Sequence, residues 1–169
     1  ALAHGGYCAT ETLGQMSPYD GGMTSPSSGD LFRERVRETV ERIIREAGLE
    51  GRFHVEVEYP SPHGSAIREQ GRKVDVAVLL KEDLRPDLFL ECKWQSTSGS
   101  AEDKLFRAAE EARRDRLFGV HSVVVVGGPG FGAKMRRWAL TEGFIHESFL
   151  EAWLREFFES GPARRRRRG

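Results

Sequence analysis

Cysteine and lysine are scarce in this chain, and long apolar runs are missing from it. The 169 residues include two cysteines, Cys8 and Cys92, whose separation matches no zinc-binding spacing, so neither a structural disulfide nor a zinc module is expected. No apolar run approaches the roughly 20 residues that a membrane-spanning helix requires. The first residues also lack the charged-then-apolar pattern of a secretory signal. We therefore expect a cytoplasmic protein that has no contact with membranes.

The chain also lacks a net charge, because 26 basic residues balance 26 acidic ones. Only five of the basic residues are lysines, so arginine dominates. A neutral total does not exclude nucleic acid as a partner, since local patches matter more than the sum. Four arginines are candidates to line a DNA groove, and a merely solvated face is the alternative for them. They are Arg113, Arg114, Arg136 and Arg137.

Composition divides the chain into an arm, one domain and a tail. Residues 1–29 are rich in Gly, Ser, Thr and Pro, which predicts a flexible arm. Residues 30–160 contain enough apolar positions for one folded domain. Residues 161–169 include five consecutive arginines and are expected to form a disordered basic tail, with a non-specific DNA arm as the alternative.

Within the domain, the spacing of apolar residues predicts the order α-β-β-β-α-β followed by two C-terminal helices. Asp30 or Ser28 is expected to cap the first helix. A short polar connector predicts that the second and third strands form an antiparallel hairpin. A β-branched run predicts a buried strand that is reached through a helical crossover. The first of the two C-terminal helices is short and includes Lys134, Arg136 and Arg137. The other expected elements cover residues 30–47, 53–59, 73–80, 87–93, 101–118, 121–126 and 147–158.

Three charged side chains interrupt the second and third predicted strands. Asp75 lies inside the first of these apolar runs, and Glu91 and Lys93 end the other. Burying a charge costs several kcal/mol or more unless it is paired or bound to a metal ion. Because strand side chains alternate, Glu91 and Lys93 share one face, whereas Cys92 points to the opposite face. Asp75 reaches the same face as Glu91 if the register of the two strands allows it.

This arrangement predicts a magnesium site. Two carboxylates close together repel each other unless a cation intervenes, and Mg²⁺ prefers hard oxygen ligands. We expect Asp75 and Glu91 to bind Mg²⁺, for which Mn²⁺ can substitute, and the backbone carbonyl of Cys92 to add a ligand. Lys93 would orient an attacking water or help to deprotonate it, so the expected chemistry is attack on a phosphodiester.

Asp75, a spacer of 15 residues and the tripeptide Glu91-Cys92-Lys93 resemble the PD-(D/E)xK nuclease superfamily. Valine stands at position 74, where that family usually has a proline. The resemblance implies a restriction-endonuclease-like α/β fold, with a three-layer α/β/α core around a mixed sheet. It also implies a catalytic role for Gln95, which resembles the extra polar residue of many members. Many members add a glutamate from the first helix, for which Glu34, Glu38 and Glu41 are the candidates here.

The strand context carries this inference more than the tripeptide does. Residues 102–104, Glu-Asp-Lys, match the same short pattern, but their polar surroundings predict the solvated first turn of a helix. The structural alternative for Asp75, Glu91 and Lys93 is a set of ion pairs on an exposed sheet face.

The function expected from the sequence is a Mg²⁺-dependent endonuclease that hydrolyses DNA. The resemblance favours a restriction-like or mobile-element nuclease, and cutting both strands would favour a homodimer. A structure-specific nuclease of the junction-resolvase type is one alternative. A non-catalytic nucleic-acid-binding module on the same fold is another, and a partner-binding domain with no chemistry is a third.

Overall fold

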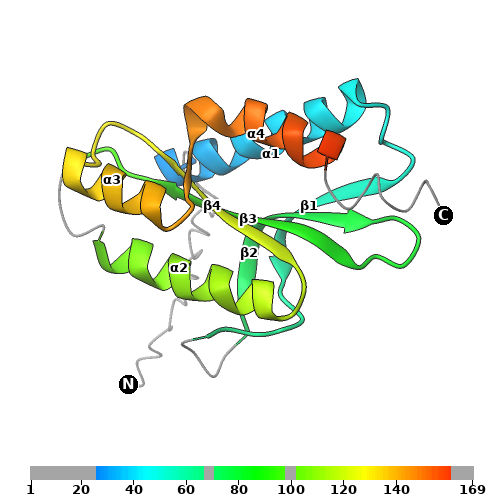
Figure 1. The fold of residues 1–169 in the computed structure, drawn as a ribbon, viewed down its shortest axis with the longest axis horizontal. Helices are drawn as coiled ribbons and strands as arrows, with labels where there is room; N and C mark the ends of the chain where they lie inside the picture. Colours follow the sequence, from blue (N-terminus) through cyan, green and yellow to red (C-terminus); the bar gives the residue numbers. More distant parts are fainter. Residues whose placement is uncertain (1–25, 67–70, 98–101, 161–169) are drawn as a thin grey trace, which may run out of the picture.

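The computed structural model describes residues 26–66, 71–97 and 102–160 (Figure 1). Most of the predicted arm and all of the predicted basic tail lie outside these ranges. These ranges contain four helices and five strands, in the order α1, β1, β2, β3, α2, β4, α3, β5, α4. Their bounds are α1 Ser28–Glu46, β1 Phe53–Pro60, β2 Lys73–Leu80, β3 Pro86–Trp94, α2 Glu102–Leu117, β4 His121–Gly127, α3 Ala133–Thr141, β5 Ile145–His146 and α4 Glu147–Ser160.

The strands form one mixed sheet in the order β1-β2-β3-β4-β5. β2 is antiparallel to both of its neighbours, β1 and β3, which confirms the predicted hairpin of β2 and β3. β4 runs parallel to β3 after the crossover through α2, as the β-branched run predicts. β5 pairs with β4 through two residues only, and a segment that short shows no period in a sequence.

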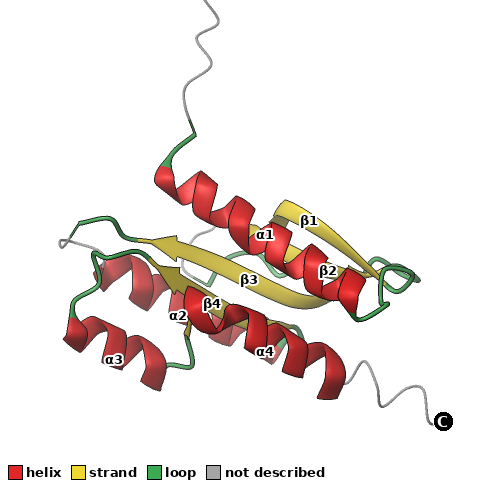
Figure 2. Cartoon of the chain, turned by 90° about the horizontal axis from the view of Figure 1, so that it is seen from above, coloured by secondary structure: helices red, strands yellow, loops and turns green. Residues whose placement is uncertain are grey.

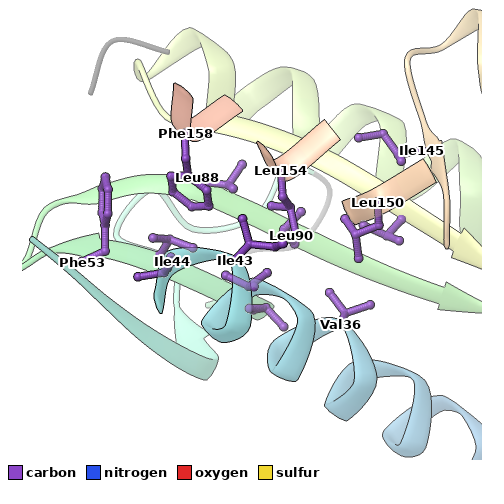
Figure 3. Close-up of a cluster of buried hydrophobic side chains, with 14 of the residues drawn as sticks. Val36, Ile43, Ile44, Phe53, Leu88, Leu90, Ile145, Leu150, Leu154 and Phe158 are labelled. Atoms are coloured by element: carbon purple, nitrogen blue, oxygen red, sulfur yellow. The ribbon is translucent and has the colours of Figure 1, made fainter. Parts of the chain in front are cut away.

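Helices cover both faces of the sheet (Figures 1 and 2), so the fold is the expected three-layer α/β/α arrangement. α1 and α4 lie side by side on one face, where their apolar residues pack on those of the strands (Figure 3). This core includes Val36, Ile43, Leu88, Leu90 and Leu154, all of which are almost fully buried. α2 and α3 cover the other face, and a smaller apolar cluster joins them to β4.

The cap of α1 is neither of the two expected residues, because it lies one residue before Ser28 and three before Asp30. Ser27 is the N-cap, and its hydroxyl accepts a hydrogen bond from the backbone N–H of Asp30 at 3.1 Å. Asp30 returns the bond, because its carboxylate accepts from the Ser27 N–H at the same distance. Asp30 is therefore the third residue of a reciprocal capping box, and the helix begins earlier than its own apolar period indicates.

Candidate active site

The pairing between β2 and β3 ends just where the charged residues begin. Val76 pairs with Leu90, and continuation of this register would place Asp75 opposite Glu91. The Asp75 carboxylate instead accepts a hydrogen bond from the Cys92 backbone N–H at 2.7 Å, in place of a backbone ladder. A side chain thus satisfies a strand donor, and the carboxylate is fixed between the two strands.

Lys93 joins the two carboxylates that the sequence singles out. Its ammonium lies 3.0 Å from Glu91 Oε1 and 3.8 Å from Asp75 Oδ2. The side chains of Asp75 and Lys93 are each 24% exposed and that of Glu91 is 15% exposed, so the group is largely shielded but reachable from solvent. Asp75 is therefore in register to share a cation with Glu91.

Burial and mutual proximity set the protonation of this group. Burial raises the pKa of the Asp75 carboxyl and Glu91 raises it further, whereas Lys93, the Cys92 N–H and Arg33 oppose the rise. Burial alone would lower the pKa of the Lys93 ammonium, but Glu91 and Asp75 outweigh this effect and raise that pKa above its usual value. Lys93 is therefore a cation and a hydrogen-bond donor in this arrangement.

Cys92 lies between the two charged side chains of β3 and faces the other way. Its side chain packs against the core formed with α1 and α4, as strand alternation predicts. Burial raises the pKa of its thiol well above the usual value, so the thiol acts as a neutral packing group. The Cys92 N–H points toward Asp75. Because the N–H and C=O of one residue in an extended strand face the same neighbour, the Cys92 carbonyl is also directed toward β2.

α1 and β1 contribute two further charges to the site. Arg33 of α1 lies 3.4 Å from Glu58 Oε1 and 3.9 Å from Asp75 Oδ1. Glu58 has a backbone φ of 49°, in the left-handed region that residues with a Cβ rarely adopt. It interrupts β1 between Val57 and Tyr59, each of which pairs with β2. This local strain turns a carboxylate toward the ion pairs around Asp75.

A buried network holds Glu91 from the α2 side. The Arg72 guanidinium lies 3.3 Å from Glu91 Oε2 and contacts both oxygens of Asp115 at 2.8 and 2.9 Å. Asp115 is fully buried and also accepts a hydrogen bond from the Ser122 hydroxyl at 2.8 Å. Arg72 therefore ties the end of β3 to α2 and β4, and its own side chain is only 7% exposed.

Gln95 follows the end of β3, and its side chain is directed elsewhere. The amide of Gln95 donates to the Thr97 carbonyl at 2.6 Å. Its backbone is held by the turn after β4, because its N–H donates to the Gly127 carbonyl and its C=O accepts from the Gly130 N–H. Gly128 in this turn has a φ of 100°, and a Cβ there would lie 2.3 Å from the Gln95 carbonyl oxygen. A catalytic role for Gln95 stays a prediction, and the structure gives it a place beside the turn.

The first-helix glutamates that the family resemblance suggested do not reach the ion pairs around Asp75. Glu34 and Glu41 both accept hydrogen bonds from Arg37 on the same helix. Glu38 is exposed. Arg33 is the residue of α1 that approaches Asp75.

The four candidate nucleic-acid-binding arginines lie on α2 and α3. Arg113 pairs with Glu110 and Glu142, and Arg114 donates to the His63 carbonyl at 3.1 Å. Arg136 and Arg137 border an apolar hollow next to α4. Nucleic-acid contact by these residues stays a prediction.

The oxygen donors of the site fit a magnesium ion. Mg²⁺ in proteins is usually held by one or two carboxylates together with several waters. Asp75 and Glu91 would supply those carboxylates from neighbouring strands, and their mutual repulsion is the condition that a cation relieves. In the described ranges, no group of three or more His, Cys, Asp or Glu side chains is arranged around a common metal position. A fully protein-coordinated site is thus not formed by these residues.

The mixed sheet with helices on both faces and a carboxylate–carboxylate–lysine group at the end of its hairpin defines a nuclease-like α/β domain. A family model described as a PD-(D/E)XK nuclease superfamily domain matches residues 27–152, about three quarters of the chain. The chain belongs to this superfamily. Comparisons with curated proteins and with solved structures gave no match. Within the described residues, no helix has both the length and the apolar character needed to cross a bilayer.

Sequence reasoning missed the charges that surround the central group. Arg33 is one of many charged residues in the first predicted helix, and Arg72 directly precedes the second predicted strand, so neither stands out in the sequence. Glu58 fits the polar side of an alternating strand. One signal was available on α2, where Lys104, Arg107 and Glu111 recur at helical spacing along one side.

Proposed function

We propose that this protein is a metal-dependent endonuclease that hydrolyses phosphodiester bonds of DNA, with a restriction-like or mobile-element role. The contact of the Lys93 ammonium with both Glu91 and Asp75, at the point where the β2–β3 ladder ends, carries the proposal. Membership of a nuclease superfamily supports the reaction class. DNA as the substrate rests on the family resemblance and on the arginine-rich composition.

Asp75 and Glu91 would hold Mg²⁺, with the Cys92 carbonyl as a further ligand and Mn²⁺ as a substitute. When bound, the ion would supply Lewis-acid stabilisation of the charge that develops on the phosphoryl and leaving oxygens. Lys93 would donate a hydrogen bond that orients the attacking water or a phosphate oxygen. Glu91 is held between Lys93 and Arg72, so its carboxylate is positioned before the substrate arrives.

Plasmid cleavage tests the proposal. We expect supercoiled DNA to be nicked or linearised in Mg²⁺ and to stay intact in EDTA, with Mn²⁺ supporting activity. Lys93→Ala should lower the rate at least 100-fold, because it removes the ammonium next to both carboxylates. A matched Lys81→Ala variant, in the exposed turn at the other end of the hairpin, should cleave like the wild type. Equal cleavage by wild type and Lys93→Ala would refute the assignment.

A non-catalytic nucleic-acid-binding domain is the second candidate, because Lys93 and Arg72 already neutralise Glu91 within the protein. It predicts salt-dependent DNA binding without cleavage in any divalent metal. Cleavage of four-way junctions in preference to linear duplex would identify a junction-resolving nuclease instead. Cutting of both strands would favour a homodimer, which light scattering of the purified protein with and without DNA would detect.

A further inference from the structure

A cavity of about 300 Å³ adjoins the candidate active site on the side of α2. Glu91 and Lys93, which belong to the candidate active site, form one of its walls. The other walls come from Ser65, from residues 71–73 at the start of β2 and from the first three turns of α2. Asp75 is absent from the described residues that line it, so the cavity is displaced from the position between the two carboxylates.

The charge of this cavity is positive. Five cationic side chains and two carboxylates line it. Both carboxylates are already engaged, because Glu91 pairs with Arg72 and Lys93, and Glu111 accepts from the Ser65 hydroxyl and from the Ala66 N–H. The cations are Arg72, Lys73, Lys93, Lys104 and Arg107.

Three of these cations lack an ion-pair partner in the described part of the chain. Lys73, Lys104 and Arg107 are exposed and form no ion pair with a described residue. Arg72 at the back of the cavity is different, because Asp115 fixes it and its buried Nε has no hydrogen-bond partner among the described groups. The cavity thus combines a rigid guanidinium with three cations that are free to close on an anion.

We propose that this cavity binds a second phosphate of the nucleic acid, next to the scissile one. Lysine and arginine in a concave site recognise phosphate oxygens by charge-assisted hydrogen bonds. Because Lys93 and Glu91 belong to both sites, a phosphate here is a neighbour of the bond to be cut along the same strand. The inference rests on the proposed function and adds a contact that sets the position of the strand. The phosphate is either internal to a strand or at its end.

Salt-dependent binding of a short labelled DNA duplex in EDTA tests the cavity without cleavage. Each duplex phosphate that a protein neutralises adds about 0.9 to the slope of log K against log salt. We expect the double variant Lys104→Gln/Arg107→Gln to lower the slope by about 0.9 and to bind about five- to tenfold more weakly at 0.1 M salt. The control Lys81→Gln/Arg85→Gln removes two charges from the turn at the other end of the hairpin and should match the wild type.

The duplex is tested with 5′-phosphate, 3′-phosphate and hydroxyl ends. A slope change with every duplex assigns the cavity to an internal phosphate, and a change only with a phosphorylated end assigns it to a terminal one. Equal slopes for the double variant and the control, or no binding by the wild type, would overturn the inference. Cleavage that occurs without any slope change overturns this inference alone. A slope change without cleavage in any metal overturns the proposed hydrolysis and leaves the phosphate site standing.

Discussion

Arg72 connects a buried carboxylate to a candidate metal ligand. Its guanidinium contacts both oxygens of Asp115 and lies beside Glu91, and nearly all of its side chain is out of contact with water. A buried charge that loses its partner is destabilising by several kcal/mol, because no solvent replaces the lost interaction. The same residue is therefore expected to matter for folding and for the placement of Glu91.

Arg72→Met should lower the free energy of unfolding by about 3 kcal/mol, because Asp115 stays buried without its cation. Urea denaturation monitored by circular dichroism measures this change. Arg113→Met is the control on α2, since Arg113 is half exposed and its pairs with Glu110 and Glu142 are worth at most about 1 kcal/mol. Asp115→Asn combined with Arg72→Met should cost less than the sum of the two single changes. Strict additivity would contradict direct coupling of the pair.

Glu58 has a strained backbone conformation, and two substitutions distinguish the effect of this strain on stability from the effect of the charge. Glu58→Gly and Glu58→Ala both remove the carboxylate that contacts Arg33. At a φ of 49°, glycine avoids the Cβ penalty that alanine keeps. We expect Glu58→Gly to be more stable than Glu58→Ala by about 1 kcal/mol in thermal or urea unfolding. Equal stability of the two variants would show that the left-handed conformation is not retained in solution.

The sequence predicts the central charges because they violate a pattern, and it misses their partners because these do not. Asp75, Glu91 and Lys93 stand out as charges in apolar strands. Arg33 and Glu58 sit where polar residues are expected, so only the packing of α1 and β1 on β2 reveals that Arg33 contacts both Glu58 and Asp75. Gln95 is two residues after Lys93 and would share its face if the strand continued. Because β3 ends at Trp94, strand alternation no longer determines which way the Gln95 side chain points.

At the scale of elements, α1 and α4 are joined by apolar packing beneath a set of surface ion pairs. Glu151 of α4 accepts hydrogen bonds from Arg42 of α1 at 2.8 Å and from Arg155 at 2.9 Å. Arg155 also reaches Glu46 at the end of α1. The hydrogen bond from Arg42, and then that from Arg155, lower the pKa of the Glu151 carboxyl to about 2.

This shift gives the α1–α4 contact a pH dependence of known sign. The pKa of Glu151 is lower in the folded protein than its ordinary value of 4.5, so the ion pairs stabilise the fold fully above that value. The Tm difference between wild type and Glu151→Gln should therefore be largest near neutral pH and vanish as the pH falls toward 2. High salt should reduce it, because the pairs are exposed.

Calorimetry of the two proteins between pH 7 and pH 2 checks this expectation. Glu38→Gln serves as the control, because Glu38 is an exposed residue of α1 that forms no ion pair with the described part of the chain. A Tm difference for Glu151→Gln that persists unchanged at pH 2 would show that the glutamine alters packing and that charge is not the cause.

The elements most visible in the sequence are the long ones with a clear period. The helical spacing of Val36, Val40 and Ile43 predicts α1, and the connector between β2 and β3 predicts their hairpin. β5 escapes prediction, because its two residues pair with β4 only after α3 has brought them there. Its existence depends on tertiary packing and not on local propensity.

At the scale of the whole molecule, the proposed metal binding would be linked to stability. Any ligand that binds the folded chain and not the unfolded one raises the free energy of unfolding. With free Mg²⁺ at ten times its dissociation constant, the gain is about 1.4 kcal/mol, which corresponds to roughly 3–6 °C in Tm for a domain of this size. Differential scanning fluorimetry across a Mg²⁺ titration measures the shift.

Asp75→Asn should abolish this shift, because it removes one of the two carboxylates proposed to hold the ion. Asp83→Asn should keep it, since Asp83 lies in the exposed turn between β2 and β3. A wild-type Tm that is constant up to millimolar Mg²⁺ would favour a domain whose charges serve only to pair with one another. The test needs no substrate and no knowledge of a recognition sequence.

Gly128 limits which substitutions the protein can accept near this site. The turn that contains it presses directly on the Gln95 backbone, and neither the space nor the φ admits a Cβ. A library that varies every position and selects for cleavage should therefore reject substitutions at Gly128 as firmly as those at Lys93. Exposed Lys104 and Arg107, on the α2 side of the site, should instead accept substitutions without disturbing the backbone that ends β3.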